Sequence, residues 1–177
     1  MIKKILAGLA VIVALFLVYV GLQSPDYMIS REITINASAE KIFPYLNNSK
    51  LAEQWGPWME VDPQAKMVYS GPDSGVGSKS SWVSTGHLGT GSATIADSTP
   101  NSKVGIQLEY SKPMVMTQYS EYLVRSENGQ SVVTWRVQGK NNFMCRIMAT
   151  FMNMDKMVGQ MFEKGLSNLK TLVEKQS

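Results

Sequence analysis

Residues 103–138 read KVGIQLEYSKPMVMTQYSEYLVRSENGQSVVTWRVQ, and this stretch decides the fold class. Runs rich in β-branched and aromatic residues are interrupted by Ser-Lys-Pro at 111–113 and by Glu-Asn-Gly at 127–129, which are turn sequences. Both interruptions are too short for a crossover helix, so the runs predict neighbouring antiparallel strands. In the first run apolar side chains alternate with polar ones, and one face collects Val104, Ile106, Leu108 and Tyr110.

The same β-rich character extends back toward residue 66, with turn clusters at intervals of roughly ten to fifteen residues. Six strands are therefore expected here, at residues 67–70, 77–84, 89–97, 103–110, 115–125 and 131–138. An antiparallel sheet with alternating strands needs cover on only one face. A single long amphipathic helix can supply that cover.

The segment before this sheet predicts one more strand and two short helices. Residues 30–36 (SREITIN) alternate in the manner of a strand. Ser38 is placed to cap the helix that follows, and Asn-Asn-Ser at 47–49 breaks the pattern of that helix. A second short helix is expected at residues 49–55, where a Gly-Pro pair then ends it.

The C-terminal segment, residues 143–174, has the periodicity of an amphipathic helix. Six of the twelve methionines of the chain lie between Phe143 and Phe162. At about 100° per residue they flank an apolar face made by Phe143, Ile147, Phe151, Val158, Phe162, Leu166, Leu169 and Val173. Methionine fills gaps in ordinary cores and also lines adaptable apolar sites; the periodicity alone favours the core.

Asp155 interrupts this apolar face, because a continuous helix would bury it among Met144, Phe151 and Phe162. Burying an unpaired carboxylate is costly. We therefore expect a break near residues 153–155, with Asp155 capping a second helical segment. The alternative is a polar contact between Asp155 and a ligand inside a cavity.

The N-terminal residues predict a membrane anchor. The eighteen residues from Ile5 to Leu22 carry no charge, a length at the lower limit for a membrane span. Lys3 and Lys4 precede this run, so the positive-inside rule places the N-terminus in the cytoplasm. The expected organisation is a single-pass anchor of a cytoplasmic (inner) membrane over residues 1–24 and one extracytoplasmic or periplasmic domain over residues 25–177. A cleaved signal peptide is the alternative.

Composition argues against several functional classes. The formal net charge is only +3, and basic residues do not cluster, so we expect no nucleic-acid partner. Cys145 is the only cysteine and His87, in a predicted turn, is the only histidine. We therefore expect no disulfide within the chain, no metal site, no catalytic triad and no cofactor. The glycine-rich residues 71–80 and 86–91 fit neither a phosphate loop nor a dinucleotide fingerprint.

Several stretches together resemble one family. Residues 31–43 (REITINASAEKIF) are similar to the opening strand and helix of the START and birch-pollen-allergen-like superfamily, also called SRPBCC, and residues 55–58 (WGPW) are similar to the motif that ends its second helix. Residues 133–135 (VTW), 154–159 (MDKMVG) and 162–166 (FEKGL) resemble its membrane-anchored, polyketide-cyclase-like branch. The resemblance implies an α+β helix-grip fold, in which a curved antiparallel sheet (β-α-α-β6-α, seven strands) surrounds the long C-terminal helix.

The resemblance also implies a hydrophobic cavity between sheet and helix, and a lipid or polyketide-like ligand. On this basis we expect a membrane-tethered module that binds a hydrophobic small molecule. The residues expected to line its cavity are Trp82, Ile106, Leu108, Tyr110, Tyr119, Trp135, Met144, Met148, Phe151, Met152 and Asp155. One alternative is a cyclase or dehydratase that uses Asp155, Glu121 or Tyr119 as acid or base. The other is a protein-interaction module with an exposed apolar patch.

Overall fold

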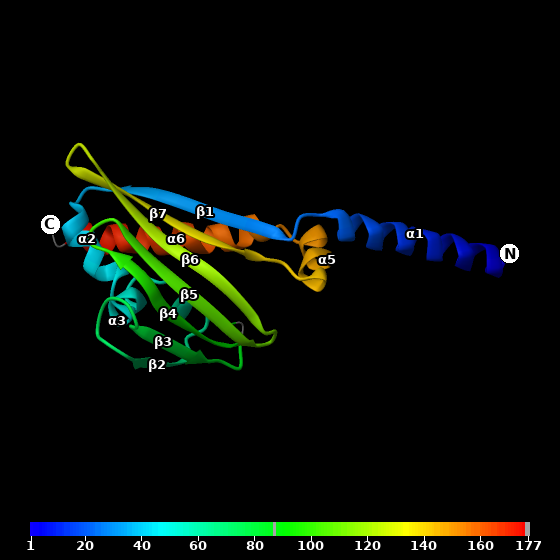
Figure 1. The fold of residues 1–177 in the computed structure, drawn as a ribbon, viewed down its shortest axis with the longest axis horizontal. Coiled ribbons are helices and arrows are strands. Elements are labelled where there is room, and N and C mark those ends of the chain that lie inside the picture. Colours follow the sequence, from blue (N-terminus) through cyan, green and yellow to red (C-terminus); the bar gives the residue numbers. More distant parts are fainter. Residues whose placement is uncertain (87, 176–177) are drawn as a thin grey trace.

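The computed structural model of the chain describes residues 1–86 and 88–175, so the predicted turn at His87 lies outside the described residues. Helix α1 (Ile2–Leu22) projects from one end of a sheet and its covering helix (Figure 1). Val20 is the one residue of α1 that is buried. Among the described residues, α1 is the one helix long and apolar enough to cross a membrane.

The predicted antiparallel sheet is confirmed. Seven strands pair in the order β1-β7-β6-β5-β4-β3-β2, and each neighbouring pair is antiparallel. The strands are β1 (Asp26–Ile35), β2 (Lys66–Ser70), β3 (Lys79–Val83), β4 (Thr90–Thr99), β5 (Lys103–Lys112), β6 (Met116–Glu127) and β7 (Gln130–Lys140). Each predicted strand is present, although β1 begins at Asp26 and not at Ser30 because it continues to pair with β7.

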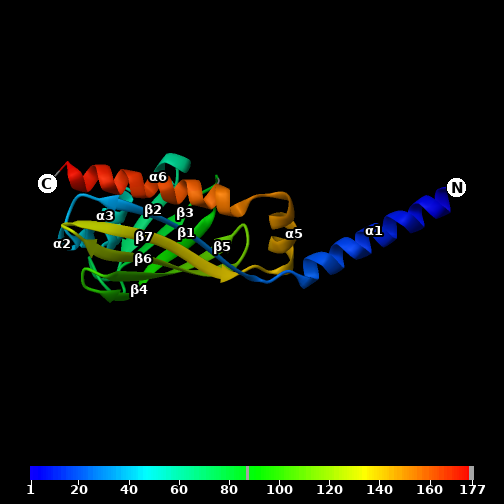
Figure 2. The same ribbon diagram turned by 90° about the horizontal axis from the view of Figure 1, so that it is seen from above.

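The strand register decides which side chains share the inner face of the sheet, which is the face covered by α6 (Met154–Glu174) (Figure 2). Val104 of β5 pairs with Tyr122 of β6, and Tyr122 pairs with Trp135 of β7. All three side chains are buried in the core. Because side chains alternate along a strand, the predicted inner face of β5 is confirmed.

Helix α6 packs along β1 and closes the core with the part from Gly159 onward, which holds its buried residues. Phe162 of α6 stacks on Trp135, with ring centroids 4.1 Å apart and planes 8° from parallel. Trp55 and Tyr122 meet the same indole nearly edge-on, at 5.5 and 5.3 Å. Gly165 permits this close packing, since a Cβ there would lie 2.7 Å from Cζ3 of Trp135. The core is therefore an aromatic cluster.

Three short helices connect β1 to β2: α2 (Ala39–Leu46), α3 (Ser49–Glu53) and α4 (Trp58–Val61). Helices α2 and α3 lie at the end of the sheet opposite α1 (Figure 1). Asn48 caps α3 by accepting hydrogen bonds from the backbone N–H groups of Lys50 and Leu51. Helix α4 was not predicted, because its single turn is too short to show a periodic pattern.

The predicted break in the C-terminal helix is confirmed, but the predicted cap was wrong. Helix α5 (Phe143–Phe151) ends before Met152, whose backbone is extended. Asn153 caps α6, since its Oδ1 accepts a hydrogen bond from the backbone N–H of Lys156 at 2.9 Å. Asp155 lies in the first turn of α6 and forms an ion pair with Arg31 of β1. The side-chain amide of Asn153, two residues before Asp155, accepts the capping hydrogen bond instead.

Candidate functional site

The inner face of the sheet is closed at one end and partly exposed at the other. Far from α1, its side chains are buried, as at Ile95, Val104 and Val133. Near α1 its side chains keep part of their surface exposed, and we call this part the open end of the inner face. Its members are Tyr27, Met67, Trp82, Leu108, Tyr110, Met116 and Gln118. The sheet is thus accessible on the side from which α1 projects.

Aromatic and amide groups give the open end its shape. The rings of Trp82 and Tyr110 meet at 71° with centroids 5.6 Å apart. Nε1 of Trp82 donates a hydrogen bond to the carbonyl oxygen of Leu88 at 3.2 Å, so the one indole donor is satisfied. Nε2 of Gln118 donates to the phenol oxygen of Tyr27. The open end is therefore largely apolar, with few polar atoms.

The two phenols of the open end stay uncharged at neutral pH. Burial raises the pKa of Tyr110 to about 12. Burial also raises the pKa of Tyr27, against the opposing effect of the hydrogen bond from Gln118. Removing water from around a phenolate disfavours the charged form, so both rings act as neutral hydrogen-bonding groups.

The structure brings four of the predicted sheet residues together. Trp82, Ile106, Leu108 and Tyr110 share the inner face at or near the open end. The sequence reasoning missed Tyr27, Met67, Met116 and Gln118. Tyr27 continues the alternation of β1 beyond its predicted start, so predicting a longer strand would have placed it on the inner face. Nothing in the sequence around the polar Gln118 marks it as an inner-face residue.

Two other predicted sheet residues lie elsewhere. Trp135 is only 3% exposed and belongs to the aromatic core at the closed end. Tyr119 is on the outer face, because the inner-face residues of β6 are its neighbours Gln118 and Ser120. The Tyr119 hydroxyl donates a hydrogen bond to the Asp97 carboxylate on that outer face.

The candidate acid–base groups do not gather at the open end. Glu121 is 4% exposed and lies on the outer face, where it pairs with Arg136 and Lys103. Tyr119 adjoins the same network, with the Lys103 ammonium 5.8 Å from its ring. Within residues 1–86 and 88–175, no three His, Cys, Asp or Glu side chains are grouped as metal ligands would be.

Asp155 is exposed on α6 and does not have the environment of a general acid. Its carboxylate lies 2.9 Å from Nη2 of Arg31, and Nε of Arg31 lies 2.8 Å from Oε1 of Glu163. The hydrogen bond from Arg31 holds the pKa of Asp155 below its usual value. A carboxyl group that donates a proton near neutral pH needs a raised pKa instead.

The predicted cavity residues of the C-terminal segment lie on α5 and in the turn after it. Met144, Met148, Phe151 and Met152 are 57%, 44%, 75% and 44% exposed. The break before α6 turns α5 toward α1 (Figure 2), and the ring of Phe151 lies 5.7 Å from the ring of Phe16. The structure therefore does not bring these four residues together with the predicted sheet residues.

Residues 28–174 match the family described as polyketide cyclase / dehydrase and lipid transport. The chain belongs to this family. The resemblance inferred from the sequence is thereby confirmed. Helix α1 precedes the matched residues, whereas the sheet, α5 and α6 lie within them. No curated protein sequence is significantly similar to this family member.

Solved structures with the same fold include proteins of different kinds. A crystal structure of a protein from Chromobacterium violaceum shares 12% identity over 83% of this chain and 96% of its own, with a TM-score of 0.59. Ara h 8.0201 shares 9% identity over 85% of this chain and 99% of its own, with a TM-score of 0.57. The Aha1 dimer from Colwellia psychrerythraea shares 20% identity over 81% and 96%, with a TM-score of 0.55. At these identities the similarity shows the fold alone.

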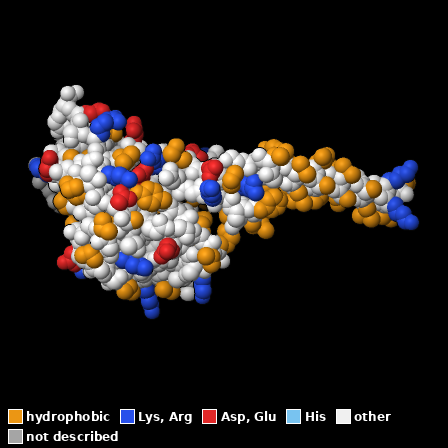
Figure 3. Space-filling view, in the orientation of Figure 1, with side chains coloured by type: hydrophobic (Ala, Val, Ile, Leu, Met, Phe, Trp, Pro, Cys, Tyr) orange, Lys and Arg blue, Asp and Glu red, His pale blue; other side chains and the backbone are white. Residues whose placement is uncertain are grey.

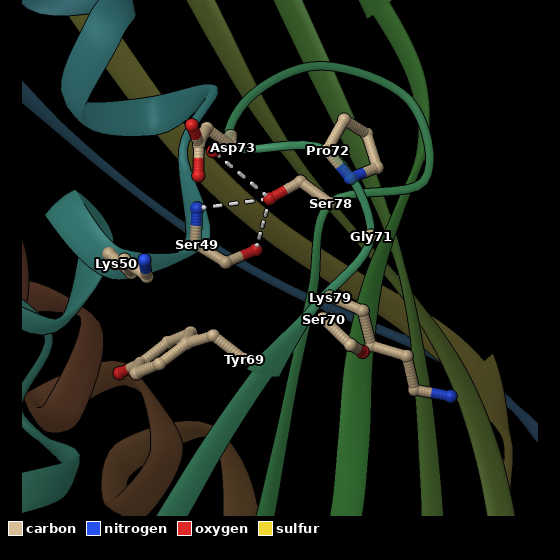
Figure 4. Close-up of a pocket in the computed structure, with 9 residues that line it drawn as sticks. All are labelled: Ser49, Lys50, Tyr69, Ser70, Gly71, Pro72, Asp73, Ser78 and Lys79. Atoms are coloured by element: carbon tan, nitrogen blue, oxygen red, sulfur yellow. Dashed lines mark hydrogen bonds between the residues drawn. The ribbon is translucent and has the colours of Figure 1, made fainter.

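One hollow in the structure is polar and small. It lies between the start of α3 and the loop after β2, where the Ser78 hydroxyl contacts Ser49 and the carbonyl oxygen of Asp73 (Figure 4). Its volume is about 60 Å³, which leaves room for only a few water molecules. This hollow is too small for the apolar ligands that the family description indicates.

A second hollow of about 450 Å³ lies at the junction of α5 and α6. It is open to the surroundings, and its walls are Ala149, Thr150, Phe151, Met152, Asn153 and Met154. Its volume is in the range of small-molecule sites. Two of the four predicted residues of the C-terminal segment, Phe151 and Met152, therefore line a hollow that adjoins α1.

Proposed function

We propose that this family member is a membrane-tethered module that binds a hydrophobic small molecule, either a lipid or a polyketide-like compound. One observation carries the proposal. In a family whose description includes lipid transport, the inner face of the sheet is closed at its far end and accessible at the end next to an apolar helix. We place the ligand against Trp82, Leu108 and Tyr110, beneath the N-terminal half of α6.

The chemistry of the open end favours an apolar ligand with a small neutral polar group. Trp82, Leu108 and Tyr110 offer apolar surface, and burial of each methylene group contributes about 0.8 kcal/mol. The polar atoms of Gln118 and Tyr27 can hydrogen-bond one oxygen of a ligand. The side chains named for the open end include no charge that would pair with an ionic group.

The tether in this proposal is α1. Its 21 residues rise about 31 Å at 1.5 Å per residue, which matches a hydrocarbon layer of about 30 Å. Figure 3 shows apolar side chains along α1 and basic side chains at its free end. Lys3 and Lys4 in the cytoplasm would place the domain on the extracytoplasmic side.

The two alternatives differ in their support. A cyclase or dehydratase would need an acid or base at the open end, whereas Glu121 and Tyr119 lie on the outer face and Asp155 is paired with Arg31. A protein-interaction module would use the exposed apolar side chains of α5, which are a specific observation in its favour. The position of that helix beside α1 favours lipid over protein as its contact.

Native mass spectrometry of the full chain, purified in a mild detergent, tests the proposed binding. Leu108→Glu places a charge on the inner face, and Gln107→Glu places the same charge on the outer face of the same strand. We expect a copurified apolar molecule in the unmodified chain and in Gln107→Glu, and its loss in Leu108→Glu. Thermal unfolding of both variants checks that they remain folded. A chain without any bound molecule, or equal retention in both variants, would contradict the proposal.

A further inference from the structure

Helix α5 has the composition of a helix that does not face water. Arg146 is its only charged residue and Thr150 its only hydroxyl residue. Phe143, Met144, Met148 and Phe151 are exposed. In a water-soluble domain, such a run of exposed apolar side chains marks a contact surface.

The only charge of α5 is used to bind the end of α1. Nη1 of Arg146 donates hydrogen bonds to the carbonyl oxygens of Gly21 at 3.2 Å and Gln23 at 2.9 Å. These carbonyls lie at the C-terminal end of α1, where a helix has acceptors without partners inside the helix. The backbone N–H of Asn141 also donates to the carbonyl oxygen of Pro25 at 2.8 Å. Helix α5 is thus fixed to the point where α1 enters the domain.

The contact between Phe16 and Phe151 shows how far from the C-terminal end of α1 the two helices meet. Phe16 precedes the last residue of α1, Leu22, by six positions, which correspond to about 9 Å along the helix axis. If Leu22 marks the boundary of the hydrocarbon layer, the ring of Phe151 lies about 9 Å inside it. Amphipathic helices at membrane surfaces bury their apolar faces by roughly 5–10 Å.

We propose that α5 is a second membrane contact: it lies in the boundary layer of the bilayer that α1 crosses, with Met144, Met148 and Phe151 among the lipid acyl chains. This inference rests on the proposed function, because it takes α1 as a membrane span. It identifies the bilayer as the immediate source or destination of the ligand. The backbone N–H of Asn141, just before α5, is hydrogen-bonded to Pro25, just before the strand of Tyr27, so α5 adjoins the open end of the inner face.

Methionine suits this position for a physical reason. Its unbranched thioether adapts to neighbours that change shape, as fluid acyl chains do. The 450 Å³ hollow at the junction of α5 and α6 opens beside Phe151, where acyl chains would fill it. A protein partner at the same place would have to dock beside Phe16, within the span itself.

Fluorescence quenching by lipid tests this proposal on the full chain. In a Cys145→Ser background, single cysteines replace Phe151, Leu15 of α1, and Ser126 near the end of β6. The turn from β6 to β7 lies far from α1 (Figure 1). Each variant carries a polarity-sensitive fluorophore and is reconstituted in vesicles of phosphatidylcholine with a minor share of phosphatidylglycerol. Phosphatidylcholine brominated on its acyl chains is the quencher.

We expect the label at position 151 to emit at shorter wavelength and to lose emission to the brominated lipid, as the label at position 15 does, while the label at position 126 is not quenched. Quenching at position 15 with none at position 151 would overturn the membrane contact of α5 and leave the tether intact, as would be found if α5 bound a protein. Absence of quenching at both positions would overturn the tether and this inference together.

Discussion

Replacing Phe162 with alanine should destabilise the domain strongly, because Phe162 is the residue by which α6 holds the aromatic core. Its side chain is 3% exposed and stacks on Trp135 at 4.1 Å. Truncating a buried phenylalanine to alanine costs about 3–5 kcal/mol. For a domain of this size each kcal/mol lowers Tm by about 2–4 °C, so we expect a fall on the order of 10 °C.

Two further variants separate core packing from helix content. Met157→Ala changes an equally apolar position on the same helix that is 45% exposed, and we expect a change within about 0.5 kcal/mol. Phe162→Leu keeps most of the buried area but loses the ring stacking, which contributes about 0.5–1.5 kcal/mol. Its Tm should therefore fall between those of the unmodified chain and Phe162→Ala.

Thermal unfolding of the full chain in detergent micelles, followed by circular dichroism, measures these differences. Equal effects of Phe162→Ala and Met157→Ala would refute the assignment of the core to the part of α6 from Gly159 onward. An equal effect of Phe162→Leu and Phe162→Ala would show that ring stacking, and not buried area, dominates the loss.

Two more predictions concern pH and topology. The lowered pKa of Asp155 stabilises the fold above the unfolded value of about 3.9, and this stabilisation is lost as pH falls through the lower folded pKa. Arg31→Gln should therefore make Tm fall less steeply in acid, whereas Lys156→Gln, which removes an exposed charge from the same helix, should keep the steep fall; equal slopes in both variants would contradict the ion pair. In intact cells, Ser126→Cys in a Cys145→Ser background should react with a membrane-impermeant maleimide, and the purified chain should keep the mass of residues 1–177. Labelling only after lysis would show that the domain lies on the cytoplasmic side. A mass lower than that of residues 1–177 would show that the N-terminal segment is cleaved.

The strand order could be predicted from the sequence because it depends on local chemistry. The turn sequences at residues 111–113 and 127–129 leave no room for a crossover, and the alternation around Ile106 fixes which side faces inward. The break before α6 was also predictable, since a continuous helix would have buried Asp155. Such features depend on neighbours in the chain, and a single sequence contains them.

The position of the methionines could not be predicted in this way. Helical periodicity places Met144 and Met148 on the same cylinder as Phe162, but it does not reveal that α5 turns away at Met152. That turn is held by long-range contacts, namely the hydrogen bonds from Arg146 to Gly21 and Gln23. Nothing near Arg146 in the sequence indicates these partners.

Tertiary packing also decides which side chains of β6 face inward and how deeply Trp135 is buried. Tyr119 and Tyr122 are both aromatic, and only the register with β5 places the first outside and the second inside. Trp135 is buried because Gly165 lets α6 approach its ring. An aromatic residue in a strand thus indicated an apolar face correctly, but not whether that face meets a ligand or the core.

Site-specific photocrosslinking compares the two faces of the sheet most directly. A benzophenone amino acid replaces Tyr110 on the inner face or Tyr119 on the outer face, two matched positions on neighbouring strands. The full chain is reconstituted in vesicles of phosphatidylcholine and illuminated, and intact mass is measured. We expect a lipid adduct at position 110 and none at position 119. No adduct at position 110, or equal adducts at both positions, would contradict binding of an apolar molecule at the open end of the inner face.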